Sequence, residues 1–316
     1  MIAIPELEPA AIRTAHGAID PAFTASPQYV HEGLSARLGV PVIVKVETVN
    51  PIRSFKGRGT WVAVSALAAE HQIDLDRPIV CASAGNFGQG VAYAARALGI
   101  PAVVFASLHA NRAKIGRMRA FGAEVVEVGE DFDEARVASE AFVAQRGGEL
   151  LVDGDDPRIS TGAATLALEV TDAAETRALP YPAIVSVPVG NGALINGVGS
   201  WLRVLAQCRV VGIQASAAPA MTLSWRASRP IDTESAATYA DGIASRVAIP
   251  RAVELMAGRI DDMVLVTDEE LRAAQAELTI ELGITVEGAA GASWAGLLAG
   301  PRPDGPALVI VTGSNV

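Results

Sequence analysis

Residues 78–98 read PIVCASAGNFGQGVAYAARAL, and they contain the pattern that decides the fold. The short apolar run Pro78–Ala82 is typical of a buried strand, and the alanine-rich segment Gly88–Leu98 has the period of a helix. A turn of small residues joins them. The same alternation recurs along most of the chain. It predicts an α/β fold in which an open, mostly parallel sheet is covered by helices on both faces.

The other predicted elements extend this pattern on both sides of that segment. The predicted strands are Pro41–Glu47, Pro78–Ala82, Ala102–Phe105, Glu124–Val128, Ala183–Val189, Val210–Gln214, Asp262–Val266 and Ala307–Thr312. The predicted helices are Gly57–His71, Gly88–Leu98, Arg112–Phe121, Asp131–Arg146, Ala163–Arg177, Leu194–Leu205, Asp268–Leu282 and Ala289–Ala299. Residues 215–240 have little periodicity, and we expect loop or irregular helix there.

Loop-forming residues mark two expected domain boundaries, near Gln72–Arg77 and Gly147–Pro157. The segment between them holds several strand–helix steps, which is enough for a small domain. We therefore expect two open, mostly parallel sheets flanked by helices. One belongs to a large, discontinuous domain of residues 1–72 and 153–316, and the other to a smaller inserted domain of residues 73–152.

The composition excludes several classes of protein. Half of the 316 residues are apolar and 19% are charged, which excludes a disordered chain. The net charge of −10 argues against a nucleic-acid partner. No uncharged apolar run reaches about 18 residues, and Met1–Glu6 do not resemble a secretory signal, so we expect no membrane partner and a cytoplasmic location. Two cysteines and four scattered histidines count against a metal site.

Three of the 25 basic residues are lysines: Lys45, Lys56 and Lys114. Lys56 belongs to the motif Asn50–Gly59 (NPIRSFKGRG), which follows a predicted strand and opens a predicted helix. The positive end of the helix dipole disfavours an ammonium at that position. A lysine amine in a closed site can attack an aldehyde and form a Schiff base. The alternative is a surface lysine at a loop–helix junction.

Three glycine-containing loops follow predicted strands. In Ala82–Gly90, small residues let backbone N–H groups approach an anion. Val189–Leu194 has the strand–loop–helix arrangement that binds phosphates. Val311–Val316 places Thr312 at the carboxyl end of a strand, where open α/β sheets bind ligands. Each loop alone is equally well explained as a packing or surface turn. Together with Lys56, they predict a site for a phosphorylated aldehyde cofactor.

In this order, the motifs resemble those of the fold-type-II pyridoxal-phosphate enzymes, the tryptophan-synthase β-subunit group, and within it the serine/threonine dehydratase-like branch. The similarity covers almost the whole chain. The motifs that carry it are Lys45-Val46-Glu47, Ser54-Phe55-Lys56, Ser83-Ala84-Gly85-Asn86, Gly122-Ala123-Glu124-Val125, Asp155-Asp156-Pro157, Ala240-Asp241-Gly242-Ile243-Ala244, Glu287-Gly288-Ala289-Ala290-Gly291 and Thr312-Gly313-Ser314-Asn315. The resemblance implies pyridoxal 5'-phosphate as cofactor, held by the large domain, a small-molecule amino-acid substrate and a homodimer.

The resemblance also implies roles for single residues. Lys56 would form the Schiff base and later move the substrate proton. The cofactor-binding residues would be Phe55, Lys56, Asn86, Gly190, Asn191, Gly192, Ala193, Leu194, Glu287 and Thr312. The residues Ser83, Ala84, Gly85 and Asn86 would bind the substrate. Lys45 would be a strand partner and Lys114 a surface charge on a helix.

The implied reaction is the elimination of water from a β-hydroxy amino acid such as threonine or serine, after which hydrolysis of the enamine product gives a 2-oxo acid and ammonia. Thr312 favours elimination, because a hydroxyl cannot give the pyridine nitrogen a formal proton. Ala84 stands where racemases of the branch carry a serine, so we expect little racemisation. One alternative is a replacement enzyme resembling threonine synthase, with Arg53, Arg58 and Arg112 as candidates for binding a second phosphate. Another is a non-catalytic protein that retains the fold.

The chain departs from the branch at three informative positions. Phe87 stands where the dehydratases usually have histidine, and Gly57 replaces an aliphatic residue. Gln214 stands where some relatives have a cation-binding glutamate, so no bound metal is predicted. These differences leave the side chain of the substrate open.

Overall fold

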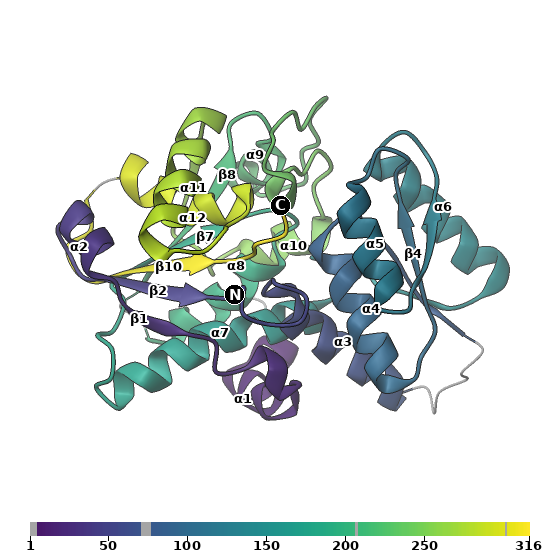
Figure 1. The fold of residues 1–316 in the computed structure, drawn as a ribbon, viewed down its shortest axis with the longest axis horizontal. Helices are drawn as coiled ribbons and strands as arrows, with labels where there is room; N and C mark the ends of the chain where they lie inside the picture. The colour runs from purple at the N-terminus through teal and green to yellow at the C-terminus, as the bar shows by residue number, and fades with distance from the viewer. Residues whose placement is uncertain (1–4, 71–76, 206–207, 301) are drawn as a thin grey trace.

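The structure, a computed structural model, describes residues 5–70, 77–205, 208–300 and 302–316. Figure 1 shows two β-sheets side by side. The larger sheet has the strand order β1 (Gln28–Val30), β2 (Val42–Val46), β10 (Ala307–Val311), β7 (Ile184–Pro188), β8 (Arg209–Ala215) and β9 (Asp262–Val266). Its neighbouring strands run parallel, except that β1 is antiparallel to β2. The predicted mostly parallel architecture is confirmed.

The smaller sheet is parallel throughout. Its strand order is β5 (Glu124–Glu127), β4 (Ala102–Ala106), β3 (Ile79–Ala82) and β6 (Glu149–Leu150). All of these strands come from the segment that we expected to form the inserted domain. Ala63 and Val64, from the helix before that segment, pack in the same apolar cluster as the small sheet. The domain boundaries at 72 and 153 stay a prediction.

Helices cover both sheets (Figure 1). Those beside the larger sheet are α1 (Pro9–Ala18), α2 (Glu32–Leu38), α7 (Pro157–Glu175), α8 (Ala193–Leu202), α9 (Ala220–Ala227), α10 (Pro250–Met256), α11 (Asp268–Leu282) and α12 (Gly288–Ala299). Those beside the smaller sheet are α3 (Lys56–Glu70), α4 (Asn86–Leu98), α5 (Arg112–Ala120) and α6 (Phe132–Arg146). Within the described residues, no helix combines the length and apolar character needed to cross a membrane.

Alternate residues of the inner strands of the larger sheet face opposite layers of helices, because successive side chains in a strand point to opposite faces. In the larger sheet, Ile43 and Ile310 pack in a cluster with residues of α7 and α8. Their neighbours Val42 and Val309 pack in another with residues of α11 and α12. Burial on both faces explains why these strands read as continuous apolar runs. In the smaller sheet, Cys81 is buried, and burial raises the pKa of its thiol.

Some elements differ from the sequence prediction for identifiable reasons. Helix α7 begins at Pro157, before the predicted start at Ala163, because the Asp156 side chain caps the helix and proline fits its first turn. Helix α9 lies inside the stretch 215–240 that lacked periodicity. The seven-residue helices α2 and α10 and the two-residue strand β6 are too short to show a period. The predicted end of one helix, His71, lies outside the described residues.

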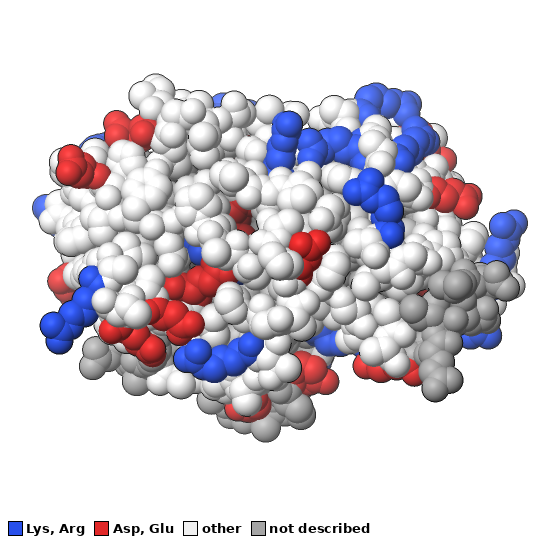
Figure 2. Space-filling view, turned by 60° about the horizontal axis from the view of Figure 1, so that its bottom comes forward, with Lys and Arg blue, Asp and Glu red and all other residues white. Residues whose placement is uncertain are grey.

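Acidic and basic side chains are interspersed over the face shown in Figure 2, among large areas of other residues. Acidic residues outnumber basic ones in the whole chain, 35 to 25, which gives the net charge of −10.

Candidate active site

A cavity of about 640 Å³ opens where the carboxyl ends of β3, β7 and β10 approach one another. Open α/β sheets bind ligands at this end of their strands. The structure brings every predicted site residue to the wall of this one cavity: Phe55, Lys56, Ser83, Ala84, Gly85, Asn86, Gly190, Asn191, Gly192, Ala193, Leu194, Glu287 and Thr312. The cavity therefore joins the lysine motif and all three predicted loops, although they are far apart in the sequence.

Lys56 is the first residue of α3, and the loop before it is fixed by its own side chains. The Asn50 Oδ1 accepts hydrogen bonds from the backbone N–H of Ile52 and Ser54, each at 3.2 Å. The Lys56 side chain is 16% exposed, and its Nζ donates to the Asp153 Oδ2 at 2.7 Å. The amine is thus held inside the cavity by a carboxylate, and the alternative of a surface lysine is wrong.

Backbone hydrogen bonds tie the lysine loop to the C-terminal loop. The Phe55 N–H donates to the Thr312 carbonyl at 3.0 Å. The Glu287 N–H donates to the Gly313 carbonyl, also at 3.0 Å. Since Thr312 and Gly313 continue directly from strand β10, the central strand of the sheet positions both Lys56 and Glu287.

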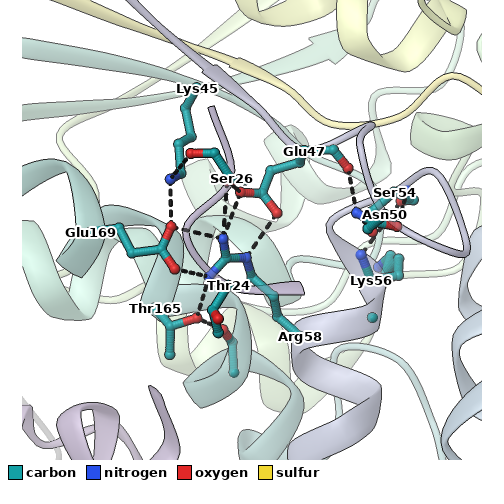
Figure 3. Close-up of polar contacts among 12 residues, drawn as sticks. Thr24, Ser26, Lys45, Glu47, Asn50, Ser54, Lys56, Arg58, Thr165 and Glu169 are labelled. Carbon is teal, nitrogen blue, oxygen red and sulfur yellow. Dashed lines mark hydrogen bonds and ion pairs between the residues drawn. The ribbon is translucent and has the colours of Figure 1, made fainter. Parts of the chain in front are cut away.

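A buried cluster of charged side chains holds the first turn of α3 in place (Figure 3). The Arg58 guanidinium, fully buried, donates to the carboxylates of Glu47 and Glu169 at 2.8–3.0 Å. The Lys45 Nζ donates to the same Glu169 at 2.5 Å. Burial alone would raise the pKa of Glu169, but its bonds and charge interactions with Arg58 and Lys45 hold that pKa at about 2. The cluster connects α3 to β2 and α7, and so it fixes the helix that carries Lys56.

Asn86, Glu287 and Asn315 form a hydrogen-bonded chain on another wall. The Asn86 Nδ2 donates to both carboxylate oxygens of Glu287, at 2.9 and 3.0 Å. The Asn315 Nδ2 donates to the Asn86 Oδ1 at 2.8 Å. Burial raises the pKa of Glu287 to about 7, although the bond from Asn86 works in the opposite direction. Asn315 belongs to the C-terminal motif but had no predicted role; here it orients Asn86.

The loop from Gly190 to Leu194 places the N-terminus of α8 at the cavity. Gly192 has φ of +93°, a conformation that favours glycine, and precedes the first helical residue. A Cβ at Gly190 would lie 2.5 Å from the Gly242 carbonyl oxygen. Backbone N–H groups at a helix N-terminus attract anions, so this loop fits a phosphate.

Two hydroxyl groups in the cavity have different partners. The Ser83 Oγ accepts from the N–H groups of Gly85 and Gly88, at 3.2 and 2.9 Å, and so shapes the turn before α4. The Thr312 Oγ is buried and has no hydrogen-bond partner among the described residues. A buried hydroxyl without a partner calls for an explanation, and a ligand atom in the cavity supplies one.

Several residues of the cavity wall were not predicted. Lys114 was expected to be a surface charge, but its side chain is buried and forms an ion pair with Asp241 from the other side of the cavity. Arg246 likewise pairs with Asp133 at the N-terminal end of α6. Asp153 is the third residue of the cavity wall that was not predicted. Its sequence signal was its position beside the Asp155-Asp156-Pro157 motif, but nothing local linked it to Lys56.

The arginines considered for a second phosphate do not line the cavity. Arg58 is engaged in the buried cluster. The Arg112 side chain is 72% exposed and pairs with Glu127. Arg53 is likewise absent from the cavity wall. None of the three arginines considered for the replacement alternative therefore reaches this cavity.

A part-buried amine, a helix N-terminus suited to phosphate and an unpartnered hydroxyl face one cavity. This combination defines an enzyme that uses a phosphorylated aldehyde cofactor. The model of the family described as "Pyridoxal-phosphate dependent enzyme" matches residues 19–313, and the chain belongs to that family. Its cofactor is pyridoxal 5'-phosphate, and it groups with the serine/threonine dehydratase-like branch.

Relatives and solved structures support this assignment. The chain is 32% identical to an L-threonine ammonia-lyase of Geobacter sulfurreducens over 285 residues, which are 89% of this chain and 69% of the relative. It is 33% identical to an L-threonine ammonia-lyase of Thermotoga maritima, in a match that spans 90% of this chain and 69% of the relative. The crystal structure of a threonine deaminase from T.th. has a TM-score of 0.89 at 28% identity, and the match covers 98% of each chain.

Proposed function

We propose that the protein is a pyridoxal-phosphate-dependent ammonia-lyase that converts a β-hydroxy amino acid, such as threonine or serine, to a 2-oxo acid and ammonia. The observation that carries the proposal is the Lys56 amine, which lies in one cavity with the loop at the N-terminus of α8. The names of the relatives support the reaction class, since both bacterial ammonia-lyases match about nine-tenths of this chain.

Lys56 performs the proton transfers in this proposal. The cofactor, when bound, supplies the electron sink that stabilises negative charge at the substrate Cα. Lys56 would hold the cofactor through its amine, and its free amine would take the Cα proton of the substrate. It then returns a proton to the departing hydroxyl, which leaves as water. Acid–base assistance of this kind is typically worth about 10²–10⁴-fold in rate.

The loops around Lys56 bind and orient the cofactor. Gly190, Asn191, Gly192, Ala193 and Leu194 hold the phosphate through backbone N–H groups and the dipole of α8. Other residues act on the ring. Phe55 would pack beside the ring, Glu287 would lie near it, and Asn86, oriented by its bonds to Glu287 and Asn315, would bind its hydroxyl oxygen.

The substrate carboxylate binds at the start of α4. The Ser83 hydroxyl holds the turn through two backbone N–H groups, and Ala84, Gly85 and Asn86 follow at the N-terminal end of a 13-residue helix. The helix dipole favours an anion there. Thr312 would offer its hydroxyl to the pyridine nitrogen. Because a hydroxyl supplies no formal proton, the chemistry favoured would be rapid loss of the β-hydroxyl.

A panel of amino acids assayed for 2-oxo acid formation tests this function. We expect product from threonine or serine with no co-substrate. Turnover confined to a phosphorylated homoserine would instead support a replacement enzyme. The purified protein should show visible absorbance from the bound cofactor. Lys56→Ala should lose that band, whereas Arg37→Ala, which removes an exposed cation paired with Glu277, should retain it.

We also propose a homodimer in the cytoplasm, with a large domain of residues 1–72 and 153–316 and an inserted domain of residues 73–152. The arrangement in two sheets supports the domain division. Homodimer and location rest on the sequence and the resemblance, and analytical ultracentrifugation tests the oligomeric state.

A further inference from the structure

Asp153 is the carboxylate nearest to the chemistry, and no motif assigned it a role. It lies between β6 and α7, and its side chain is 11% exposed. Its Oδ2 accepts from the Lys56 Nζ at 2.7 Å and, more weakly, from the Asn191 Nδ2 at 3.5 Å. Asp153 therefore touches both the reacting amine and the proposed phosphate loop.

The hydrogen bonding of Asp153 differs from that of a structural carboxylate. Glu169 in the buried cluster uses both oxygens, which accept from Lys45, Arg58 and the Ala25 N–H. The Asp153 Oδ1, in contrast, is buried and has no partner among the described residues. A carboxylate kept half-paired in a cavity costs stability, and such groups occur at functional sites.

We propose that Asp153 is a catalytic residue that binds the Lys56 ammonium whenever Lys56 is not bonded to the cofactor. A substrate amine must take the place of Lys56 on the cofactor, and the released side chain then stays in a part-buried cavity. Leaving its charge unpaired there is costly, whereas a hydrogen-bonded carboxylate stabilises it. The observed ion pair supplies the geometry of this released position.

The consequence for the reaction rests on the proposed function. The Lys56 ammonium first passes one proton to the hydrogen-bonded Asp153 carboxylate. The Cα–H bond then breaks, and its proton passes to the neutral Lys56 amine. The Cβ–O bond then breaks, and the proton leaves Lys56 with the hydroxyl oxygen as water. Asp153 undergoes no net change, because it returns its proton to the Lys56 amine after water has left. Through its hydrogen bond it holds the Lys56 nitrogen in place during both transfers.

L-Alanine provides the test, because it displaces Lys56 but has no β-leaving group. We would titrate cofactor-loaded wild type, Asp153→Asn and Asp153→Glu with alanine and record the visible spectrum. The matched control is Asp172→Asn, which makes the same substitution at a carboxylate that is 43% exposed and pairs with Arg13. Since the measurement involves no elimination, it is independent of the proposed reaction, which the wild-type assay with serine and threonine tests separately.

We expect Asp153→Asn to bind the cofactor with the wild-type visible spectrum but to need about tenfold more alanine for half of the spectral change. Asp172→Asn should titrate like wild type, and Asp153→Glu should recover most of the difference. A wild-type titration curve for Asp153→Asn would overturn the proposal. So would a loss of cofactor in that variant, or no displacement of Lys56 by alanine in wild type, because the proposed role begins only after cofactor binding and release of the amine.

Discussion

The amide nitrogen of Asn86 lies 2.9 and 3.0 Å from the two carboxylate oxygens of Glu287, and these hydrogen bonds join residues 201 positions apart in the sequence. Asn86 begins α4 beside the smaller sheet, and Glu287 precedes α12 on the larger sheet. The pair therefore spans the cavity. Burial raises the pKa of Glu287 to about 7, which makes this contact sensitive to pH.

Glu287 should make the cofactor-free protein less stable as pH rises from about 4.5 to 7. In this range the folded state keeps the proton that the unfolded state has lost, so stability falls, and above the folded-state pKa the loss is complete. Glu287→Gln removes this dependence. Relative to wild type, the free energy of unfolding of the variant should increase by up to about 3 kcal/mol between pH 4.5 and 7. Urea unfolding at several pH values measures it; parallel pH profiles for the two proteins would contradict the assignment.

Arg58→Met should strongly destabilise the protein, because it leaves the carboxylates of Glu47 and Glu169 buried without their main cation. Breaking one partner of a buried ion pair costs about 3–5 kcal/mol. Chemical denaturation gives the difference in unfolding free energy. Arg13→Met is the control, since that residue forms an exposed pair with Asp172 and should cost less than about 1 kcal/mol. Equal costs at the two sites would show that the buried cluster does not anchor α3.

Gly192→Ala should weaken cofactor binding about tenfold or more. The substitution forces a Cβ onto a residue with φ of +93° and places that atom 2.9 Å from the Ala252 Cβ, so the phosphate loop must shift. Gly258→Ala is a matched control, because Gly258 has φ of +72° but open space around its Cβ position. Both variants should lose about 1–3 kcal/mol of stability from backbone strain. A cofactor titration followed by absorbance should separate them, and unchanged affinity in Gly192→Ala would argue against a phosphate at this loop.

Wild-type protein should eliminate water from serine with little interconversion of its enantiomers, because Ala84 has no proton to exchange on the opposite face of the substrate. Ala84→Ser should raise racemisation relative to elimination. Chiral chromatography of the remaining serine, together with a 2-oxo acid assay, gives both rates from one reaction. If wild type racemises as fast as it eliminates, the inference from Ala84 is wrong.

The sequence was sufficient to predict the strands and loops that build the cavity. Parallel strands end at the same edge of a sheet, so residues just after neighbouring strands, such as Thr312 after β10 and Gly190 after β7, can be brought together by topology alone. Lys56 could be found because the chain has few lysines and one lies at a loop–helix junction. These predictions depend on local patterns and on a general property of α/β folds.

The contacts of Asp153 and Lys114 could not be predicted in this way. Lys56 and Asp153 are 97 residues apart, and Lys114 and Asp241 are 127 apart. Neither pair shares a motif, a helix face or a strand register. Their contacts depend on how the two sheets are placed around the cavity. From sequence alone, a lysine on a polar helix is predicted to lie on the surface, because the residue that pairs with it is not known.

The central claim is that Lys56 bonds the cofactor, and borohydride reduction of the loaded enzyme tests it most directly. Reduction fixes the cofactor to the amine that holds it, and peptide mass spectrometry then locates the added mass. Because the chain has three lysines, the assignment has few competitors. We expect one cofactor per chain, on Lys56. Label on Lys45 or Lys114, or no label in protein that retains its visible absorbance, would contradict it.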